Sequence, residues 1–337
     1  MRKINLLCAV FAACGMALSL GAAPRNDSDP EVLSSKGGRR NYTGVYPVKT
    51  IAIITPGSYP NPKTANPAIK MLRKAGYKVK VYPNVFLRPK GVEKNRYLSS
   101  PVEVRVKDFE AAWCDMENDM ILCARGGWGT VDLVEKVNWA KLPRRPELFV
   151  MGYSDVTMLL CALYAKGYGR PIAGANLTSH GGLSPALIPE MKKMFHGEAL
   201  KPIKLKTMVP GDCSGKPVAG LLARLALTVR KNYGVDTKGR ILIIECVRST
   251  PEKIRKDLDE LFAAKFFEGA SGLVFGHFLQ SGKDEVIDKI LEDFSKKLNI
   301  PVYRGMPFGH HSKHLSIDFS RDIVIKDGIL TFPAVKK

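Results

Sequence analysis

The sequence contains few cysteines, and none of them forms a close pair. Seven cysteines are spread over 337 residues, and none belongs to a CxxC motif. Two of them, Cys8 and Cys14, fall in an apolar N-terminal segment. The other five are scattered along the rest of the chain, and their number is odd. Such a set argues against a disulfide framework and against a structural zinc site. We expect Cys123 and Cys161, which stand in apolar segments, to be small buried hydrophobic residues.

Long hydrophobic runs are missing after the N-terminus. No later segment approaches the roughly 20 apolar residues that a membrane-spanning helix needs. The chain starts with Arg2 and Lys3, an apolar run over 4–20 and small residues at 21–23, a pattern typical of a signal peptide. We predict a signal peptide at 1–22 and an exported, periplasmic protein. An uncleaved anchor, or lipid attachment at Cys14, is the alternative and would give a membrane-associated protein.

Acidic residues are also few in comparison with basic ones. The chain has 32 Asp and Glu against 52 Lys and Arg, a formal net charge of +20. Acidic cell-wall polymers and anionic lipid head groups are suitable partners for a basic exported protein. We expect no nucleic acid as a partner.

The order of apolar and polar segments predicts an α/β fold with two domains. Residues 23–47 are polar and basic, as in a flexible tether. Strand-like and helix-like segments then alternate through a predicted N-terminal domain, 48–196, which indicates a doubly wound parallel sheet with helices on both faces. The expected strands are 50–55, 77–82, 120–124 and 148–152, and the expected helices are 66–75, 106–117 and 156–166.

The second half predicts another α/β domain with a mixed sheet. Residues 197–216 are rich in Lys, Pro and Gly, which favours a connection between the domains. A C-terminal domain is expected at 217–337, where a terminal hairpin at 315–332 turns at Asp327 and Gly328. The other expected strands are 241–244, 272–275 and 301–303, and the expected helices are 251–265 and 284–298.

Ser154 stands where a predicted strand leads directly into a predicted helix. The sequence there is Met-Gly-Tyr-Ser-Asp at 151–155. A serine at this point lies at the carboxyl edge of the sheet, where open α/β sheets place their sites. The nucleophile elbow of hydrolases normally has a second glycine two residues after the serine, but Val156 occupies that position. Ser154 could instead be a helix cap.

A glycine-rich loop follows the third predicted strand. It reads Ala-Arg-Gly-Gly-Trp-Gly-Thr at 124–130, with three glycines in four positions. Such a loop brings backbone N–H groups close to a ligand and fits a phosphate site, an oxyanion hole or a tight turn. It matches neither GxGxxG nor the P-loop pattern, which disfavours a nucleotide site.

Two further segments carry chemically active side chains. His310, His311 and His314 are close in sequence, but the HExxH pattern of a zinc helix is missing, so a structural role competes with metal binding. Glu245 ends an apolar strand, where a carboxylate can orient a histidine or pair with an arginine. Each signal is weak alone, but together they give the order serine, acid, histidine of α/β-hydrolases.

At this point the sequence resembles the LD-carboxypeptidase family, which includes the microcin C self-immunity peptidases. The resemblance covers roughly 49–331 and consists of several separate motifs in the same order. They are Thr-Pro-Gly-Ser at 55–58, Ala-Arg-Gly-Gly-Trp-Gly at 124–129, Gly-Tyr-Ser-Asp-Val-Thr at 152–157, Leu-Ile-Ile-Glu at 242–245, and Ile-Pro-Val at 300–302 leading to Phe-Gly-His at 308–310.

The resemblance implies a serine peptidase that removes the terminal D-alanine from murein tetrapeptides, needs no metal or other cofactor, and forms a homodimer. Carried over by motif, Ser154 is the nucleophile, Glu245 the orienting acid and His310 the general base. The backbone N–H groups of Asp155 and Gly127 would form the oxyanion hole.

Recognition of the substrate's terminal carboxylate calls for an arginine near the site. Arg125 is the candidate by position, with a backbone contact or an interdomain salt bridge as its alternative role. Trp128 is a second candidate for substrate binding.

The chain departs from the family pattern in two places. Residues 219–222 read Ala-Gly-Leu-Leu where the family has Gly-Gly-Asn-Leu, so the departure falls at Gly220, Leu221 and Leu222. The segment from Ile317 to Ser320 replaces the usual Leu-Pro-Leu-Gly. We expect both departures to lie near the substrate cleft and to affect specificity.

Three other functions are compatible with parts of the pattern. A related amidase could cleave an aminoacyl nucleotide, although export would separate it from cytosolic substrates. A cell-wall binding module without catalysis would not need the serine, acid and histidine together. A cysteine hydrolase would use Cys246 or Cys123, neither of which has an evident histidine partner.

Overall fold

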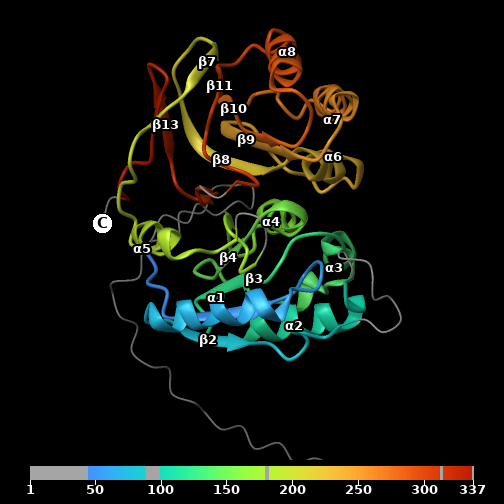
Figure 1. Cartoon of the computed structure of the whole chain (residues 1–337), viewed down its shortest axis with the longest axis vertical. Helices are drawn as coiled ribbons and strands as arrows, with labels where there is room; N and C mark the ends of the chain where they lie inside the picture. Colours follow the sequence, from blue (N-terminus) through green and yellow to red (C-terminus); the bar gives the residue numbers. More distant parts are fainter. Residues whose placement is uncertain (1–44, 89–98, 179–181, 312–313, 336–337) are drawn as a thin grey trace, which may run out of the picture. The chain divides into compact units, whose positions relative to one another are not determined.

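The computed structural model describes residues 45–88, 99–178, 182–311 and 314–335 (Figure 1). The predicted signal peptide, Cys14 and residues 23–44 of the predicted tether lie outside these ranges. Within them, no helix is both long enough and apolar enough to cross a bilayer.

The N-terminal half forms a sheet in the order β12-β5-β4-β3-β1-β2 within the described residues. Strands β1 to β5 are parallel, and β12, which comes from the C-terminal part of the chain, pairs antiparallel with β5. The strands are β1 (Thr50–Ile54), β2 (Lys78–Val81), β3 (Met120–Cys123), β4 (Phe149–Gly152), β5 (Arg170–Ala173) and β12 (Ile317–Asp318). The helices of this half are α1 (Pro62–Lys74), α2 (Val102–Cys114), α3 (Thr130–Lys136), α4 (Thr157–Lys166) and α5 (Ile188–Phe195).

Both faces of this first sheet are buried, as its apolar strands predict. All five residues of β1 are buried. Ile51 and Ile53 pack with residues of α1 and α5, whereas Ala52 and Ile54 belong to the core that includes α2, α3 and α4. Successive side chains of a strand point to opposite faces, so a strand covered on both sides is apolar throughout.

The C-terminal half forms a mixed sheet, whose order among the described residues is β6-β14-β13-β8-β9-β10-β11-β7. Strands β8 to β11 are parallel, and the outer strands pair antiparallel. The strands are β6 (Ile203–Lys204), β7 (Lys206–Val209), β8 (Cys213–Leu221), β9 (Arg240–Val247), β10 (Gly272–Leu279), β11 (Val302–Arg304), β13 (Ile323–Lys326) and β14 (Ile329–Thr331). The helices are α6 (Leu222–Arg230), α7 (Pro251–Ala263) and α8 (Asp284–Ser295).

The predicted α/β class, with a parallel sheet followed by a mixed sheet, is confirmed (Figure 1). The terminal hairpin is also confirmed in β13 and β14, which turn at Asp327 and Gly328. The segment 197–216, predicted as a connection between the domains, contains β6, β7 and the start of β8, which pair within the second sheet. Lys, Pro and Gly suit a connection, but they are also tolerated in short outer strands.

Candidate active site

Ser154 lies on a sharp turn between β4 and the helical segment that begins α4. Its φ is +67°, a left-handed conformation that costs a residue with a side chain about 1–3 kcal/mol and is concentrated at functional sites. The residues at the N-cap positions of the two helical segments are Tyr153 and Val156, so the alternative role of Ser154 as a helix cap is not seen. A Cβ atom added to Gly152 would lie 2.7 Å from Val156 Cγ1. Val156 therefore fits in the turn because Gly152, two residues before the serine, has no side chain and leaves room for it.

Ser154, His310 and Glu245 form one hydrogen-bonded chain. The distance from His310 Nε2 to Ser154 Oγ is 2.9 Å, and that from His310 Nδ1 to Glu245 Oε2 is also 2.9 Å. The Glu245 side chain is 1% exposed and the His310 side chain 12%. The carboxylate is therefore shielded from water, while the imidazole edge and the serine reach the solvent. This geometry is that of a nucleophile, a base and an orienting acid.

Gly309 allows the histidine loop to approach Glu245. Its φ is +117°, and an added Cβ would lie 2.7 Å from Glu245 Cβ and 2.8 Å from Glu245 Oε2. Real Cβ atoms do not approach other heavy atoms so closely. Only glycine therefore fits at this position with the acid in its present place.

The glycine-rich loop packs against the serine turn. A Cβ added to Gly126 would lie 3.0 Å from Ser154 Cβ and 3.3 Å from the backbone nitrogen of Asp155. Gly127, with φ +88°, follows directly, so the two predicted oxyanion donors belong to adjoining backbone segments. Their role in binding an oxyanion stays a prediction.

A buried arginine and a serine hold the glycine-rich loop in place. Arg105 Nη1 donates to the carbonyl oxygens of Pro56, at 2.6 Å, and Gly129, at 2.7 Å. Ser58 donates its N–H to the Gly126 carbonyl, and its Oγ accepts from the N–H of Trp128. Burial lowers the pKa of Arg105 from its ordinary value.

The Asp155 side chain links three elements. Its carboxylate accepts the N–H of Thr130 at the start of α3, at 2.9 Å, and pairs with Arg224 of α6, at 2.6 Å. The Arg224 guanidinium lies over the Trp128 ring, 4.6 Å from its centroid. This arrangement joins the serine turn to the second half of the chain.

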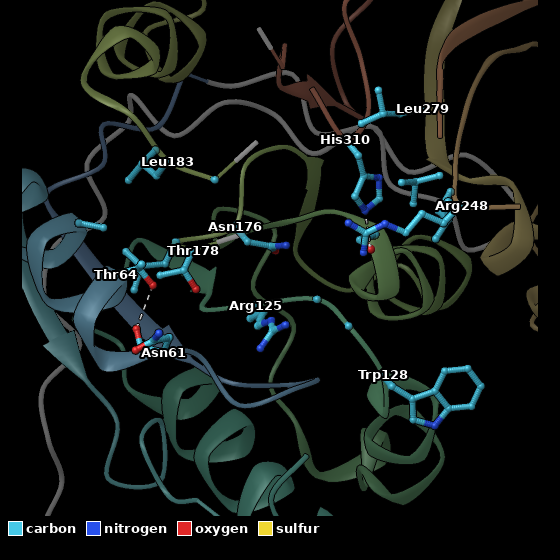
Figure 2. Close-up of a pocket in the computed structure, with 18 of the residues that line it drawn as sticks. Asn61, Thr64, Arg125, Trp128, Asn176, Thr178, Leu183, Arg248, Leu279 and His310 are labelled. Carbon is cyan, nitrogen blue, oxygen red and sulfur yellow. Dashed lines mark hydrogen bonds between the residues drawn. The ribbon is translucent and has the colours of Figure 1, made fainter. Parts of the chain in front are cut away.

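A cavity of about 1380 Å³ opens beside Ser154 and His310, and both halves of the chain line it (Figure 2). Arg125 and Trp128 line it, Trp128 is 55% exposed, and their role in substrate binding stays a prediction. Arg125 Nη1 donates to the Tyr59 carbonyl at 2.9 Å, which matches the backbone contact proposed as its alternative role. Other side chains of the wall come from α1, from the segment around Asn176 and from the ends of β8, β9 and β10.

The two halves of the chain match the two domains of one peptidase family. Residues 51–172 match the LD-carboxypeptidase N-terminal domain, and residues 214–323 match the LD-carboxypeptidase C-terminal domain. The chain belongs to the LD-carboxypeptidase family. A "Probable murein peptide carboxypeptidase" of Bacillus subtilis (strain 168) is 27% identical over 282 residues, 80% of this chain and 86% of the relative.

Solved structures share the fold of this family member. A muramoyltetrapeptide carboxypeptidase from Oxalobacter formigenes has a TM-score of 0.73 at 24% identity and covers 86% of this chain and 100% of its own. MccF in complex with glutamyl sulfamoyl guanosine has a TM-score of 0.70 at 17% identity, with 86% and 98% coverage. These likenesses establish the fold.

The three clustered histidines lie in different surroundings. His310 joins the serine, and His311 stacks on His277 with ring centroids 4.4 Å apart. His314 is buried, accepts the Gly309 N–H at 3.0 Å, and has its pKa lowered to about 3, mainly by burial. Among the described residues, no group of three or more His, Cys, Asp or Glu side chains could hold a metal ion.

The two cysteines considered as nucleophiles are fully buried. Burial raises the pKa of Cys246 to about 11 and that of Cys123 further above its ordinary value. A thiol needs its thiolate form and access to solvent to act as a nucleophile. The geometry therefore disfavours a cysteine hydrolase.

The two departures from the family pattern lie in different places. Leu221 lines the cavity, as expected for a residue that affects specificity. Asp318 does not line it, so the expectation that both departures lie near the cleft is wrong for this segment. The Asp318 carboxylate instead pairs with Arg170 of β5, at 2.8 Å, and both side chains are buried. This ion pair fastens β12 to the first sheet.

Several residues that line the cavity were not predicted from the sequence, and three polar ones lie close to the ends of strands. Arg248 and Gln280 follow the ends of β9 and β10, and Asn176 lies after β5. Asn176 Oδ1 accepts the N–H of Tyr153, next to the serine. The available signal was their place at the carboxyl ends of parallel strands, where α/β proteins bind ligands.

Proposed function

We propose that the protein is a serine carboxypeptidase that releases the terminal D-alanine from murein tetrapeptides. The proposal rests on one observation, the hydrogen-bonded chain of Ser154, His310 and Glu245 with its two distances of 2.9 Å. A nucleophile, a base and a buried acid in this order are what acyl transfer from a peptide needs.

The reaction would proceed through an acyl-enzyme. His310 Nε2 takes the hydroxyl proton as Ser154 Oγ attacks the peptide carbonyl, and the same proton then passes to the leaving amine. D-alanine departs, and an ester joins the remaining tripeptide to the serine. Water, deprotonated by His310, hydrolyses the ester and restores the free serine. Glu245 accepts a hydrogen bond from the Nδ1–H group of the imidazole throughout, which fixes the tautomer and stabilises the imidazolium.

The backbone N–H groups of Asp155 and Gly127 would stabilise the developing oxyanion. Each such donor is worth roughly 10²–10³ in rate, about 3–4 kcal/mol. The anchoring of this loop by Arg105 and Ser58 supports the assignment, because a preorganised donor needs no rearrangement during the reaction.

The choice of substrate rests on three features. The family is that of LD-carboxypeptidases, and a relative is named as a murein peptide carboxypeptidase. The net charge of +20 favours peptides rich in carboxylates. Export by the predicted signal peptide at 1–22 would place the protein in the compartment that contains murein.

The exposed Trp128 favours a second candidate, an amidase that cleaves an aminoacyl nucleotide. An exposed aromatic ring on a cavity wall can stack on a nucleobase. The likeness to MccF in complex with glutamyl sulfamoyl guanosine makes such a compound a suitable probe.

The test incubates the purified protein with a murein tetrapeptide and, separately, with glutamyl sulfamoyl guanosine, and follows the products by mass spectrometry. We expect release of D-alanine from the tetrapeptide. Ser154→Ala and His310→Ala should each lower the rate by about 10⁶-fold, since triad members act as a unit. His196→Ala, which changes an exposed histidine, is the control. If Ser154→Ala kept more than about a hundredth of the rate, the nucleophile would be misassigned.

A further inference from the structure

Two neighbouring parallel strands end in residues with the same unusual backbone conformation. Arg248 follows β9 and Gln280 follows β10, and each has a φ of +52°. The Arg248 N–H donates to the Leu279 carbonyl at 2.9 Å, and Arg248 Nε donates to Gln280 Oε1 at 2.8 Å. Two adjacent left-handed residues joined in this way fix the direction in which the arginine leaves the sheet.

The strand register places this arginine at the same sheet edge as the triad acid. Leu221 of β8 lies opposite Glu245 of β9, and Val247 lies opposite Leu279 of β10. Leu221, Val247, Leu279 and Arg248 all line the cavity. The edge therefore presents an apolar wall with a cation at its end. Figure 2 shows Arg248 and Leu279 on the side of the cavity that holds His310.

The position of His310 identifies this side of the cavity as the leaving-group side. In the proposed reaction, His310 Nε2 gives its proton to the leaving amine, so the released residue must lie next to the imidazole. Arg125, by contrast, is in the glycine-rich loop and is bonded to the Tyr59 carbonyl. Arg125 and Arg248 line the cavity, and no aspartate or glutamate does so among the described residues.

We propose that Arg248 binds the carboxylate of the leaving residue and that the apolar wall of Leu221, Val247 and Leu279 accepts its small side chain. The bond from Nε to Gln280 orients the Arg248 guanidinium, and the planar fork of a guanidinium matches the geometry of a carboxylate. D-alanine offers a carboxylate and a methyl group, which correspond to the cation and the wall. This inference rests on the proposed function and assigns to Arg248 the role that the sequence suggested for Arg125.

The experiment measures kcat/KM for two murein tetrapeptides, one with a free C-terminal carboxylate and one with a C-terminal amide. The proteins are wild type, Arg248→Gln, Arg248→Lys and, as the matched control, Arg125→Gln. A thermal melt verifies that each variant is folded. We expect amidation to lower the wild-type value by about 100-fold, because a charge-assisted pair is lost.

Arg248→Gln should lose about 100-fold on the free peptide and almost nothing more on amidation. Arg248→Lys should keep part of the preference for the free peptide, and Arg125→Gln should keep all of it. A folded Arg248→Gln that retained the wild-type preference would overturn this assignment alone. Release of D-alanine from neither peptide by the wild type would overturn the proposed function, and this assignment with it.

Discussion

Replacing Gly309 with alanine should separate Glu245 from His310 without changing either of these side chains. The added Cβ would lie 2.7 Å from Glu245 Cβ and 2.8 Å from Glu245 Oε2, so the carboxylate must move to make room. An ordinary contact distance needs a displacement of roughly 1 Å, which stretches the 2.9 Å hydrogen bond to His310 beyond bonding range.

Two known effects bracket the expected loss of activity. A misplacement of about 1 Å in an active site can lower the rate by about 10²-fold. Disabling the orienting acid of a serine triad lowers kcat by about 10⁴-fold. We therefore expect Gly309→Ala to lower kcat by between about 10² and 10⁴. The positive φ of +117° adds a strain of about 1–3 kcal/mol, which lowers the free energy of unfolding.

Gly305→Ala is a matched control for this strain. Gly305 lies in the same loop region with φ +95°, and an added Cβ meets no heavy atom within 4 Å. Gly305→Ala should lose stability in urea unfolding through the same kind of backbone strain, but only Gly309→Ala should lose D-alanine release and labelling of Ser154 by a fluorophosphonate. Activities of the two variants within about ten-fold of each other would refute the explanation that a glycine at 309 is needed to make room for Glu245.

Two predictions concern stability. Burial lowers the pKa of His314 to about 3. Below about pH 6.5 this histidine is therefore protonated in the unfolded chain but stays neutral in the folded protein. The free energy of unfolding should therefore fall by about 2 kcal/mol between pH 7 and pH 5 in urea titrations, and His314→Asn, which can still accept the Gly309 N–H, should lack this fall. Arg170→Met should lower the free energy of unfolding by about 3–5 kcal/mol, because the Asp318 carboxylate stays buried without its cation. Adding Asp318→Asn should restore part of that loss, and a double variant less stable than Arg170→Met would contradict this account.

Local sequence patterns determined the secondary structure and its order. The apolar run at 50–55 predicted a strand buried on both faces, and β1 packs against helices on either side. The break between strand and helix placed Ser154 at the end of β4, and the histidine and the acid were predicted from their motifs. These features depend on residues close together in the chain, so periodicity and short motifs reveal them.

Only the tertiary structure decided which distant segments meet. Ser154 and His310 are 156 residues apart, and their hydrogen bond depends on packing between the two halves of the chain. The strand pairing of 203–209, the crossing of β12 to the first sheet and the position of Arg248 on the cavity that His310 also lines depend on this packing as well. The residues of a segment indicate whether it favours a strand or a turn. Its partner is chosen by the burial, hydrogen bonds and charge pairs that become available only when the whole chain has folded.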